Sequence, residues 1–157
     1  MKVKLIVVGK TDAKYIEEGI EIYLKRLKHY IPFQIDIIPD IKNTKKLTEE
    51  QQKILEGEKI LEKTVAGSDI ILLDENGSEH NSVGFSNFLQ KKMNSGIREL
   101  VFVVGGPYGF SQDLYDKASG KISLSKMTFS HQMVRLFFVE QIYRGMTILK
   151  GEPYHHN

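Results

Sequence analysis

Val101-Phe102-Val103-Val104-Gly105-Gly106-Pro107-Tyr108-Gly109 is the stretch that decides the fold class of this 157-residue chain. It begins with an apolar run and continues into a glycine-rich turn. A strand that is apolar on both faces is usually central in a parallel sheet. Two adjacent glycines after it let another group approach the backbone closely. The stretch therefore predicts a buried parallel strand followed by either a tight turn or a binding loop.

Strand and helix patterns alternate along the rest of the chain. Strands are expected at residues 3–8, 33–38, 69–74, 100–104 and 121–124, with a turn at 75–78. Apolar residues at helical spacing predict a helix after each of these strands. The faces expected to be buried carry Ile16, Ile20, Tyr23, Leu24 and Leu27, then Ile54, Leu55, Leu61 and Val65, then Phe85, Phe88, Leu89 and Met93. The alternation predicts one α/β domain, residues 1–157, with a mostly parallel sheet flanked by helices.

Polar residues mark the expected helix starts. Thr48-Glu49-Glu50-Gln51 has the form of a capping box, in which the threonine and glutamine side chains each bond the other's backbone amide. Asp12, Ser82 and Ser130 are expected to cap three further helices. Pro32 is expected to end the first helix.

Composition excludes several classes of protein. The chain has no cysteine, which excludes disulfides, thiolate metal sites and cysteine nucleophiles. Its histidines and carboxylates do not fall into metal-ligand spacing, so we expect no metal. It opens on an alternating strand, without a signal-peptide pattern, and no apolar run approaches the ~20 residues of a membrane span. We expect a cytoplasmic protein without a membrane segment.

The net charge of +2 is too small to indicate a nucleic-acid binder by itself. Residues 121–157 have a local basic bias, which fits either a solvated face or a binding surface.

Three loops are expected to converge at the carboxyl ends of the strands, where ligands bind in open parallel sheets. They follow Leu72-Leu73-Asp74, Val104, and Ile122-Ser123. The glycine loop has neither the spacing of a dinucleotide fingerprint nor the Gly-Lys-Ser/Thr of a P-loop, and its proline removes an amide. It therefore suits a ligand bound through the main chain and not through phosphate.

The segment Leu124-Ser125-Lys126-Met127-Thr128-Phe129-Ser130 precedes the last helix. Leu124, Met127 and Phe129 could form an apolar floor, and Ser125 and Thr128 supply hydroxyls. The alternative is an ordinary loop that only caps the helix.

The last helix, expected at 131–149, is more apolar than a solvent-facing helix should be. Its apolar residues are Val134, Phe137, Phe138, Ile142 and Met146. A subunit interface is favoured over a wide core face, because one small domain has little sheet area to cover it.

Arg135 and Arg144 in the same helix either bind RNA phosphate or pair with Glu140. The tail that follows carries Tyr154, which offers a stacking plane, and His155, which offers an imidazole. The alternative for this tail is a disordered chain end.

Four motifs in order carry a resemblance: Gly-Gly-Pro-x-Gly after a buried strand, Leu-Ser-x-Met-Thr-Phe-x-His, then Val-Arg with Glu-Gln-x-Tyr-Arg, and a Pro-Tyr-His end. Together they look like the ribosomal RNA large subunit methyltransferase H family, a minimal branch of the SPOUT methyltransferases. The resemblance covers essentially the whole chain.

This resemblance implies a trefoil-knotted α/β fold, a homodimer, and S-adenosylmethionine as cofactor. The substrate would be a pseudouridine in a hairpin loop of 23S rRNA, methylated at N3. Because a chain of net charge +2 without a separate RNA-binding domain has little capacity to bind phosphate, we expect activity on assembled 70S ribosomes and little on free rRNA. Mapped onto this chain, the cofactor pocket comprises Leu72, Leu73, Gly105, Gly106, Leu124, Ser125, Lys126, Met127, Thr128 and Phe129.

Transfer to an imide nitrogen requires loss of its proton, so a base of near-neutral pKa is useful. His155 is the candidate base, Tyr154 would position it, and Arg135 or Arg144 would stabilise the imide anion. Other interpretations are a SPOUT enzyme acting on tRNA or another rRNA site, a non-enzymatic RNA-binding or ribosome-associated factor, and a generic nucleotide-binding enzyme.

Overall fold

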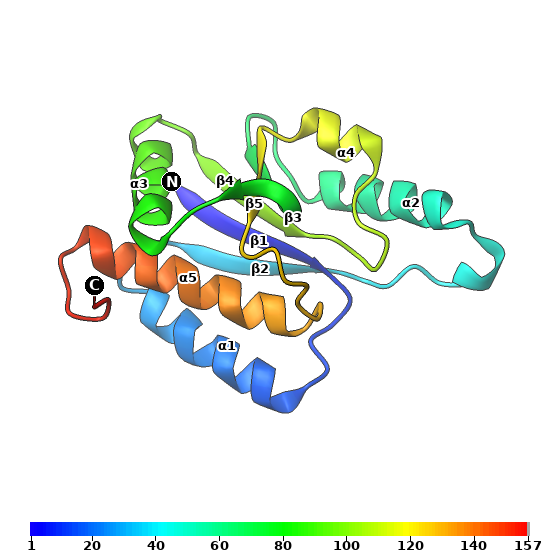
Figure 1. Ribbon diagram of the computed structural model, residues 1–157. Coiled ribbons are helices and arrows are strands. Elements are labelled where there is room, and N and C mark those ends of the chain that lie inside the picture. Colours follow the sequence, from blue (N-terminus) through cyan, green and yellow to red (C-terminus); the bar gives the residue numbers. More distant parts are fainter. Residues whose placement is uncertain (157) are drawn as a thin grey trace.

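The computed structural model describes residues 1–156 as a parallel sheet between two layers of helices (Figure 1). The strands are β1 Lys2–Val8, β2 Phe33–Ile38, β3 Asp69–Glu79, β4 Glu99–Val104 and β5 Gly120–Ser123. The helices are α1 Lys14–Leu27, the 3-10 helix η1 Thr44–Lys46, α2 Glu49–Glu62, α3 Ser82–Asn94, α4 Gln112–Lys117 and α5 Met133–Leu149. The predicted α/β alternation is confirmed.

The strand that begins the deciding stretch, β4, lies at the centre of the sheet. The order is β2-β1-β4-β3-β5, and every pairing is parallel. All residues of β4 are buried, and Phe102 is paired with Leu5 of β1 and Ile71 of β3. A strand whose residues 100–104 are all apolar is therefore found where both of its faces are covered, as predicted.

The helices divide between the two faces of the sheet (Figure 1). α1, α3 and α5 cover one face, where Phe102 and Phe138 pack with ring centroids 4.7 Å apart. α2 and α4 cover the other, where Ile60 and Leu114 pack against Leu72 and Val103. Within residues 1–156, no helix has the length and apolar character needed to cross a membrane.

β3 continues beyond the predicted strand, through the segment expected to be a turn. It pairs with β5 in two registers, so that Ile122 lies opposite both Leu73 and Ser78. Residues 74–77 bulge between the two registers. Gly77 is needed here because a Cβ on it would lie 2.5 Å from the Ile122 backbone. The bulge turns residues 74–76 toward the carboxyl end of the sheet.

The helix ends differ from the prediction in detail. The capping box of α2 is present, with the Gln51 amide donating to Thr48 Oγ1 at 3.1 Å. The prediction that Asp12 caps α1 is wrong, because Ala13 is the cap residue and makes no side-chain bond. Asn81, not Ser82, caps α3 by accepting from Gly84 N. α1 ends at Leu27, before the expected stop at Pro32.

The buried face predicted for the helix at 49–62 is only partly correct, since Leu61 packs against the core but other residues of that face do not. Ile54 and Val65 are 44% and 59% exposed, whereas Glu56, Gly57 and Ile60 are buried. Gly57 is the reason: a Cβ there would lie 2.5 Å from Ser111 Oγ, so the glycine lets the start of α4 approach the helix. The close contact, and not the largest apolar side chains, sets which face of α2 is buried.

α5 lies between α1 and α3 in its layer (Figure 1). Phe138, Val139, Ile142 and Met146 are consequently buried within the chain. Phe137 remains 41% exposed. The apolar surface available to a second subunit is therefore narrower than the helix sequence indicates.

Candidate functional site

A pocket of about 460 Å³ opens at the carboxyl ends of β3, β4 and β5. Three segments line it: the β3 bulge, the glycine loop after β4, and the loop between β5 and α5. Its walls include Leu73, Asp74, Glu75 and Asn76; Val104 through Phe110; Tyr115; Ser123, Leu124, Ser125, Met127, Thr128 and Phe129; and His131 and Val134. The convergence expected from the three strand ends is present in the structure.

The residues predicted to hold the cofactor line this pocket, with two exceptions. Leu72 is fully buried on the α2 and α4 side of the sheet, since neighbouring strand residues face opposite sides. The side chain of Lys126 is 82% exposed and its Nζ lies 3.5 Å from Glu79 Oε1. Neither side chain reaches the pocket.

The loop between β5 and α5 is shaped by its own serines. Ser123 Oγ donates to the Ser125 carbonyl at 3.0 Å, and the Met127 amide donates to Ser125 Oγ at 2.9 Å. Ser130 Oγ accepts from the Met133 amide at 3.1 Å, but Ser130 is not the cap residue that was predicted, because the N-cap of α5 is Gln132, which makes no side-chain cap bond. Met127 is 79% exposed, so it stands at the rim and is not part of an apolar floor.

The β3 bulge contributes pocket residues that the sequence did not indicate. Asp74 Oδ1 accepts from the Asn76 amide at 2.8 Å, and Tyr115 donates its hydroxyl to Asp74 Oδ2. Burial, followed by the bond to Asp74, raises the pKa of Tyr115 to about 12, so this phenol stays a donor. The signal available in the sequence was the acidic pair at the strand end, of which Asp74 was assigned to the strand and Glu75 to the turn that follows.

The lining favours a ligand without phosphate. It contains carboxylates, hydroxyls, main chain and apolar side chains, and within residues 1–156 no lysine or arginine lines it. The chain as far as residue 156 also holds no group of three or more residues suited to bind a metal ion. An uncharged or cationic organic molecule is therefore the expected occupant.

A second polar cluster lies at the other end of α5. Glu140 Oε1 accepts from Arg144 Nη2 at 2.7 Å and from the Tyr154 hydroxyl at 3.0 Å. The guanidinium also lies over the Tyr154 ring, 4.8 Å from its centroid, and Nη1 is 3.3 Å from His155 Nδ1. Three of the predicted catalytic residues are thus brought together, and the tail residues Tyr154 and His155 pack against the helix.

These contacts fix the chemistry of the tail. Burial, followed by hydrogen bonds with Tyr23 and Glu140, raises the pKa of Tyr154, so its phenol donates and does not act as a base. Arginine can only donate, so His155 Nδ1 accepts from Arg144 and the neutral ring carries its proton on Nε2.

Arg135, the fourth predicted catalytic residue, is placed elsewhere. It is only 2% exposed, and its guanidinium donates to the carbonyls of Val8 and Gly9 at 2.7 and 2.9 Å. It also bonds Thr11 Oγ1 and the His131 carbonyl. Because its donors are engaged inside the protein, Arg135 holds the β1–α1 loop against the start of α5 and does not face a substrate.

The second polar cluster, formed by Glu140, Arg144, Tyr154 and His155, is called the tail cluster. It lies far from the pocket within one chain. Val134 lines the pocket and Arg144 belongs to the cluster, and these residues are separated by ~15 Å along a helix that rises 1.5 Å per residue. The tail packs at the far end of α5, away from the pocket (Figure 1). One chain alone therefore does not combine the two groups of residues.

A family model described as "Predicted SPOUT methyltransferase" matches residues 1–155. The chain belongs to the SPOUT methyltransferase family. Curated proteins named "Ribosomal RNA large subunit methyltransferase H" are similar over nearly their whole length. The one from Flavobacterium johnsoniae is 65% identical over 99% of both chains. Those from Parabacteroides distasonis and Bacteroides fragilis are 62% and 56% identical, with the same coverage. This extent of identity places the chain in the large subunit methyltransferase H group of SPOUT proteins.

Among solved structures, Nep1 of Archaeoglobus fulgidus, bound to S-adenosylhomocysteine, aligns with 97% of this chain and 100% of its own at a TM-score of 0.43 and 9% identity. At that TM-score the likeness is too weak to support an inference about function.

Proposed function

We propose that this SPOUT protein uses S-adenosylmethionine to methylate N3 of a pseudouridine in a 23S rRNA hairpin loop, on the assembled ribosome in the cytoplasm. The observation that carries the proposal is full-length similarity, up to 65% identity, to proteins named as ribosomal RNA large subunit methyltransferases. The pocket and the tail cluster supply the residues that such a reaction needs.

The pocket fits the cofactor in its chemistry. S-adenosylmethionine carries no phosphate and bears a positive sulfonium, which agrees with carboxylates and the absence of lysine and arginine among the lining residues up to residue 156. A volume of about 460 Å³ is within the range of small-molecule sites, roughly 300–1,000 Å³. Leu73, Leu124 and Phe129 offer apolar surface for an adenine, and the main chain of the glycine loop offers its polar groups. When bound, the cofactor supplies a methyl group that leaves a neutral thioether behind.

The tail cluster supplies the proton transfer. We expect the imide N3–H to take the place of Arg144 as the donor to His155 Nδ1, since that lone pair faces the guanidinium. Arg144, released from the imidazole, then donates to an imide oxygen, where charge develops as the proton leaves. His155 takes the proton, which would leave the N3 lone pair free to be methylated. Tyr154 keeps Arg144 and Glu140 aligned through its hydroxyl and its ring.

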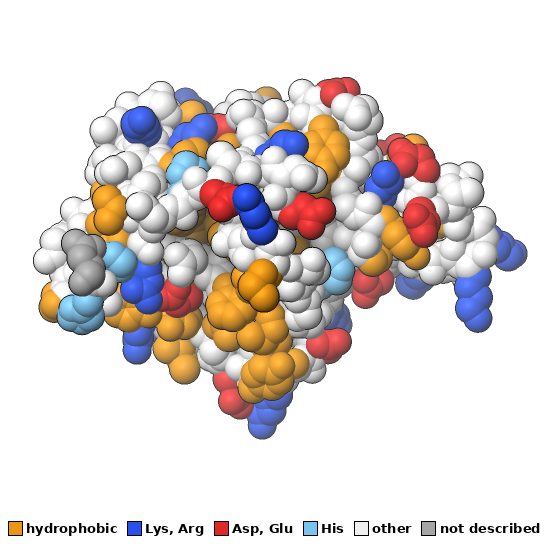
Figure 2. Space-filling model, viewed as in Figure 1, with side chains coloured by type: hydrophobic (Ala, Val, Ile, Leu, Met, Phe, Trp, Pro, Cys, Tyr) orange, Lys and Arg blue, Asp and Glu red, His pale blue; other side chains and the backbone are white. Residues whose placement is uncertain are grey.

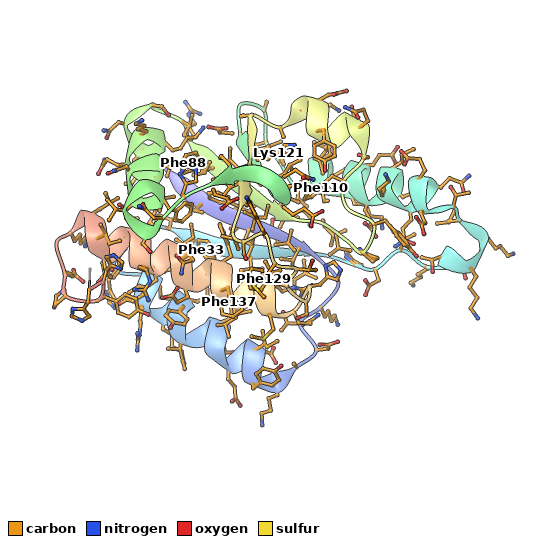
Figure 3. All side chains as sticks on the ribbon, in the orientation of Figure 1. Phe33, Phe88, Phe110, Lys121, Phe129 and Phe137 are labelled. Carbon is orange, nitrogen blue, oxygen red and sulfur yellow. The ribbon has the colours of Figure 1, made fainter. Side chains whose placement is uncertain are left out.

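A homodimer brings the two groups of residues together. Because the tail cluster does not reach the pocket of its own chain, we propose that it serves the partner's pocket. Beside the pocket of the same chain, Met127 and Phe137 are 79% and 41% exposed. The rings of Phe129 and Phe137 pack there with their centroids 5.1 Å apart (Figure 3). Figure 2 shows hydrophobic side chains gathered over α1 and α5 on this face. Such a patch on one face is suited to burial between subunits.

We also propose the trefoil knot implied by the family resemblance. It is supported by the way the glycine loop and the loop between β5 and α5 line one pocket. Activity on assembled ribosomes, with little on stripped rRNA, follows from the small net charge of +2, which gives one chain limited capacity to bind phosphate. A tRNA substrate and a non-enzymatic ribosome-associated role remain the competing functions.

The deciding experiment mixes subunits. Purified protein, S-adenosylmethionine carrying a labelled methyl group and 70S ribosomes are combined, and the modified nucleotide is mapped by mass spectrometry. A His155→Ala chain and a Gly105→Val chain are then dissociated and reassociated in equal amounts. If the tail serves the partner's pocket, half of the dimers are mixed and each has one intact site, giving about a quarter of the wild-type activity.

Controls test the shared site, the RNA substrate and the enzymatic role separately. Each variant assayed alone should be nearly inactive, and neither should change the dimer mass measured by light scattering. Methylation of tRNA in place of 23S rRNA would overturn the substrate. Cofactor binding without any transfer to RNA would favour the non-enzymatic role. No recovery in mixed dimers would overturn the shared site.

A further inference from the structure

A second concave surface lies at the opposite edge of the sheet from the cofactor pocket. It measures about 500 Å³ and is formed by the end of α1, the turn into β2 and the start of β1. Its lining comprises Lys2, Leu24, Lys28, His29, Tyr30, Ile31, Pro32, Phe33 and Gln34. We call it the amino-edge groove, because it lies where the parallel strands begin.

The amino-edge groove is basic. Lys2 and Lys28 line it, and the exposed residue Arg98 lies close to Lys2 in space, since the Lys2 amide donates to the Arg98 main-chain carbonyl at 2.8 Å. Lys150 reaches it from the end of α5, with Nζ 3.3 Å from the His29 carbonyl and 4.5 Å from the Tyr30 ring centroid. Within residues 1–156, none of these four cations forms an ion pair. Their charge is therefore directed to solvent or to a partner.

The carboxylates nearest to the groove are already engaged. Asp36 and Glu99 both lie beside Lys4 Nζ, at 3.7 and 2.9 Å. Glu152 accepts from the Tyr30 hydroxyl. Lys4 offsets only one of the two carboxylates beside it, and the neutral Tyr30 hydroxyl leaves the charge of Glu152 in place. The four cations without ion pairs within residues 1–156 nevertheless outnumber these carboxylates, so the groove keeps a positive bias that attracts an anionic polymer.

The groove is continuous with the tail cluster. The Tyr30 ring contacts Tyr143 edge-on with centroids 5.6 Å apart, and Tyr143 contacts Tyr154 at 4.7 Å. These rings form a row that leads from the groove to the residues proposed to handle the imide. Figure 2 shows Lys, Arg and His side chains gathered at this end of the molecule, near the C-terminus. A nucleotide held at the tail cluster would carry its flanking backbone past this surface.

We propose that the amino-edge groove binds the sugar–phosphate backbone of the rRNA segment that flanks the target nucleotide. Cations without partners provide the phosphate contacts, and the exposed parts of Tyr30 and Phe33 provide ring surface for a base or ribose. The combination of both favours RNA over an acidic protein surface. The inference rests on the proposed rRNA substrate and adds the surface by which the RNA is held.

The test is a double charge reversal, Lys28→Glu with Arg98→Glu, since both side chains are exposed. The matched control is Lys45→Glu with Lys46→Glu in η1, at the opposite end of the molecule (Figure 1). We expect the groove variant to raise the KM for ribosomes roughly 10-fold or more at ~0.1 M salt. We also expect the slope of the logarithm of the ribosome-binding constant against the logarithm of the salt concentration to become less steep by about one or two. kcat at saturating ribosomes and the Kd for S-adenosylmethionine should stay at wild-type values. The control variant should keep the wild-type KM.

An equal rise in KM in the control variant would show a general charge effect and overturn the inference, as would an unchanged KM and salt slope in the groove variant. A photo-crosslinking residue at position 28 tests the occupant. Crosslinks to 23S rRNA support the groove as an RNA site, and crosslinks to ribosomal protein alone contradict it. If wild-type protein transfers no methyl group to ribosomes, the proposed function has failed, whereas wild-type transfer with an unaffected groove variant refutes only the groove.

Discussion

The two ends of α5 use an arginine in opposite ways. At the first end, Arg135 is 2% exposed and donates to main-chain carbonyls of the β1–α1 loop. At the second end, Arg144 pairs with a side chain, Glu140, and its own side chain is 26% exposed. Main-chain partners cannot move without moving the fold, whereas side-chain partners can be exchanged. The comparison indicates that one arginine maintains the pocket and the other takes part in chemistry.

Arg135→Met is the largest disruption that the comparison predicts. It removes the donors to several buried acceptors at once, including the Val8 and Gly9 carbonyls. We expect a loss of about 3–5 kcal/mol in unfolding free energy, as for a broken buried network, together with loss of cofactor binding. Urea denaturation followed by circular dichroism measures the first effect, and isothermal titration measures the second. Arg135→Lys, which keeps the charge without the fork of donors, should recover part of the stability. A stable variant that binds cofactor but fails to methylate would instead make Arg135 catalytic.

Arg144→Ala should produce the opposite result. Its partly buried i,i+4 pair with Glu140 is expected to contribute about 1 kcal/mol to stability, far less than the buried network of Arg135. We expect kcat to fall at least about 100-fold, equivalent to ~2.7 kcal/mol in the barrier, with cofactor affinity unchanged. Single-turnover methylation of 70S ribosomes measures the rate. Arg144→Lys is the matched control, since it retains a cation but loses the guanidinium geometry. If Arg144→Ala unfolds at the same urea concentration as Arg135→Met, the distinction between the two ends is wrong.

Glu56 is a buried carboxylate at the pocket end of the molecule. Its carboxyl is 3% exposed beneath the glycine loop; Oε1 accepts from Gln52, and Oε2 has no hydrogen-bond partner within residues 1–156. A Cβ on Gly106 would lie 2.2 Å from Oε2, so the loop rests directly on this acid. Burial raises the pKa of Glu56, and the nearby Asp40 acts in the same direction.

The sign of the resulting pH dependence follows from linkage. The folded state holds the Glu56 proton more tightly than the unfolded state does. The contribution of Glu56 to the unfolding free energy is therefore greatest at pH values below the ordinary pKa of the carboxyl. Stability then declines as the pH rises through the raised pKa. Glu56→Gln should remove this decline and raise the unfolding free energy at pH 8 by about 1–2 kcal/mol, with little change at pH 4. Urea midpoints at both values measure it. An equal shift at the two pH values would show that packing, and not ionisation, is responsible.

The fold could be predicted largely because periodicity reports burial. The apolar residues of β4 indicated a central strand, and the capping box of α2 is a local pattern satisfied by local contacts. The β3 bulge and the buried face of α2 could not be predicted in this way. Each depends on a glycine that permits a close approach, Gly77 against Ile122 and Gly57 against Ser111, and a single sequence does not reveal which distant segment will be its neighbour.

The residues of the candidate site also fall into those that sequence motifs indicate and those that depend on tertiary contacts. Motif resemblance indicated Gly105 and the 124–129 loop, which line the pocket, but it also included Leu72, whose side chain faces the opposite side of the sheet. Asp74 was missed because the bulge that turns it toward the pocket is a tertiary feature. Arg135 and Arg144 are indistinguishable in sequence terms, since both are single arginines in an apolar helix. Only burial and hydrogen-bond partners separate their roles.

Lys126 gives the smallest expected effect and tests whether the pocket ends where the structure places its wall. Its side chain is 82% exposed, and its one ion pair within the described residues is with Glu79, at 3.5 Å. Lys126→Ala should change the unfolding free energy by less than about 0.5 kcal/mol and leave cofactor affinity within about twofold. Ser125→Ala, one residue away, removes the acceptor for the Met127 amide and should weaken cofactor binding about 5- to 10-fold by loosening the loop. Titration calorimetry on the two variants compares them directly. A larger effect at Lys126 would mean that the loop closes over the ligand and brings this lysine inward, so the pocket of the dimer would extend beyond the walls seen in one chain.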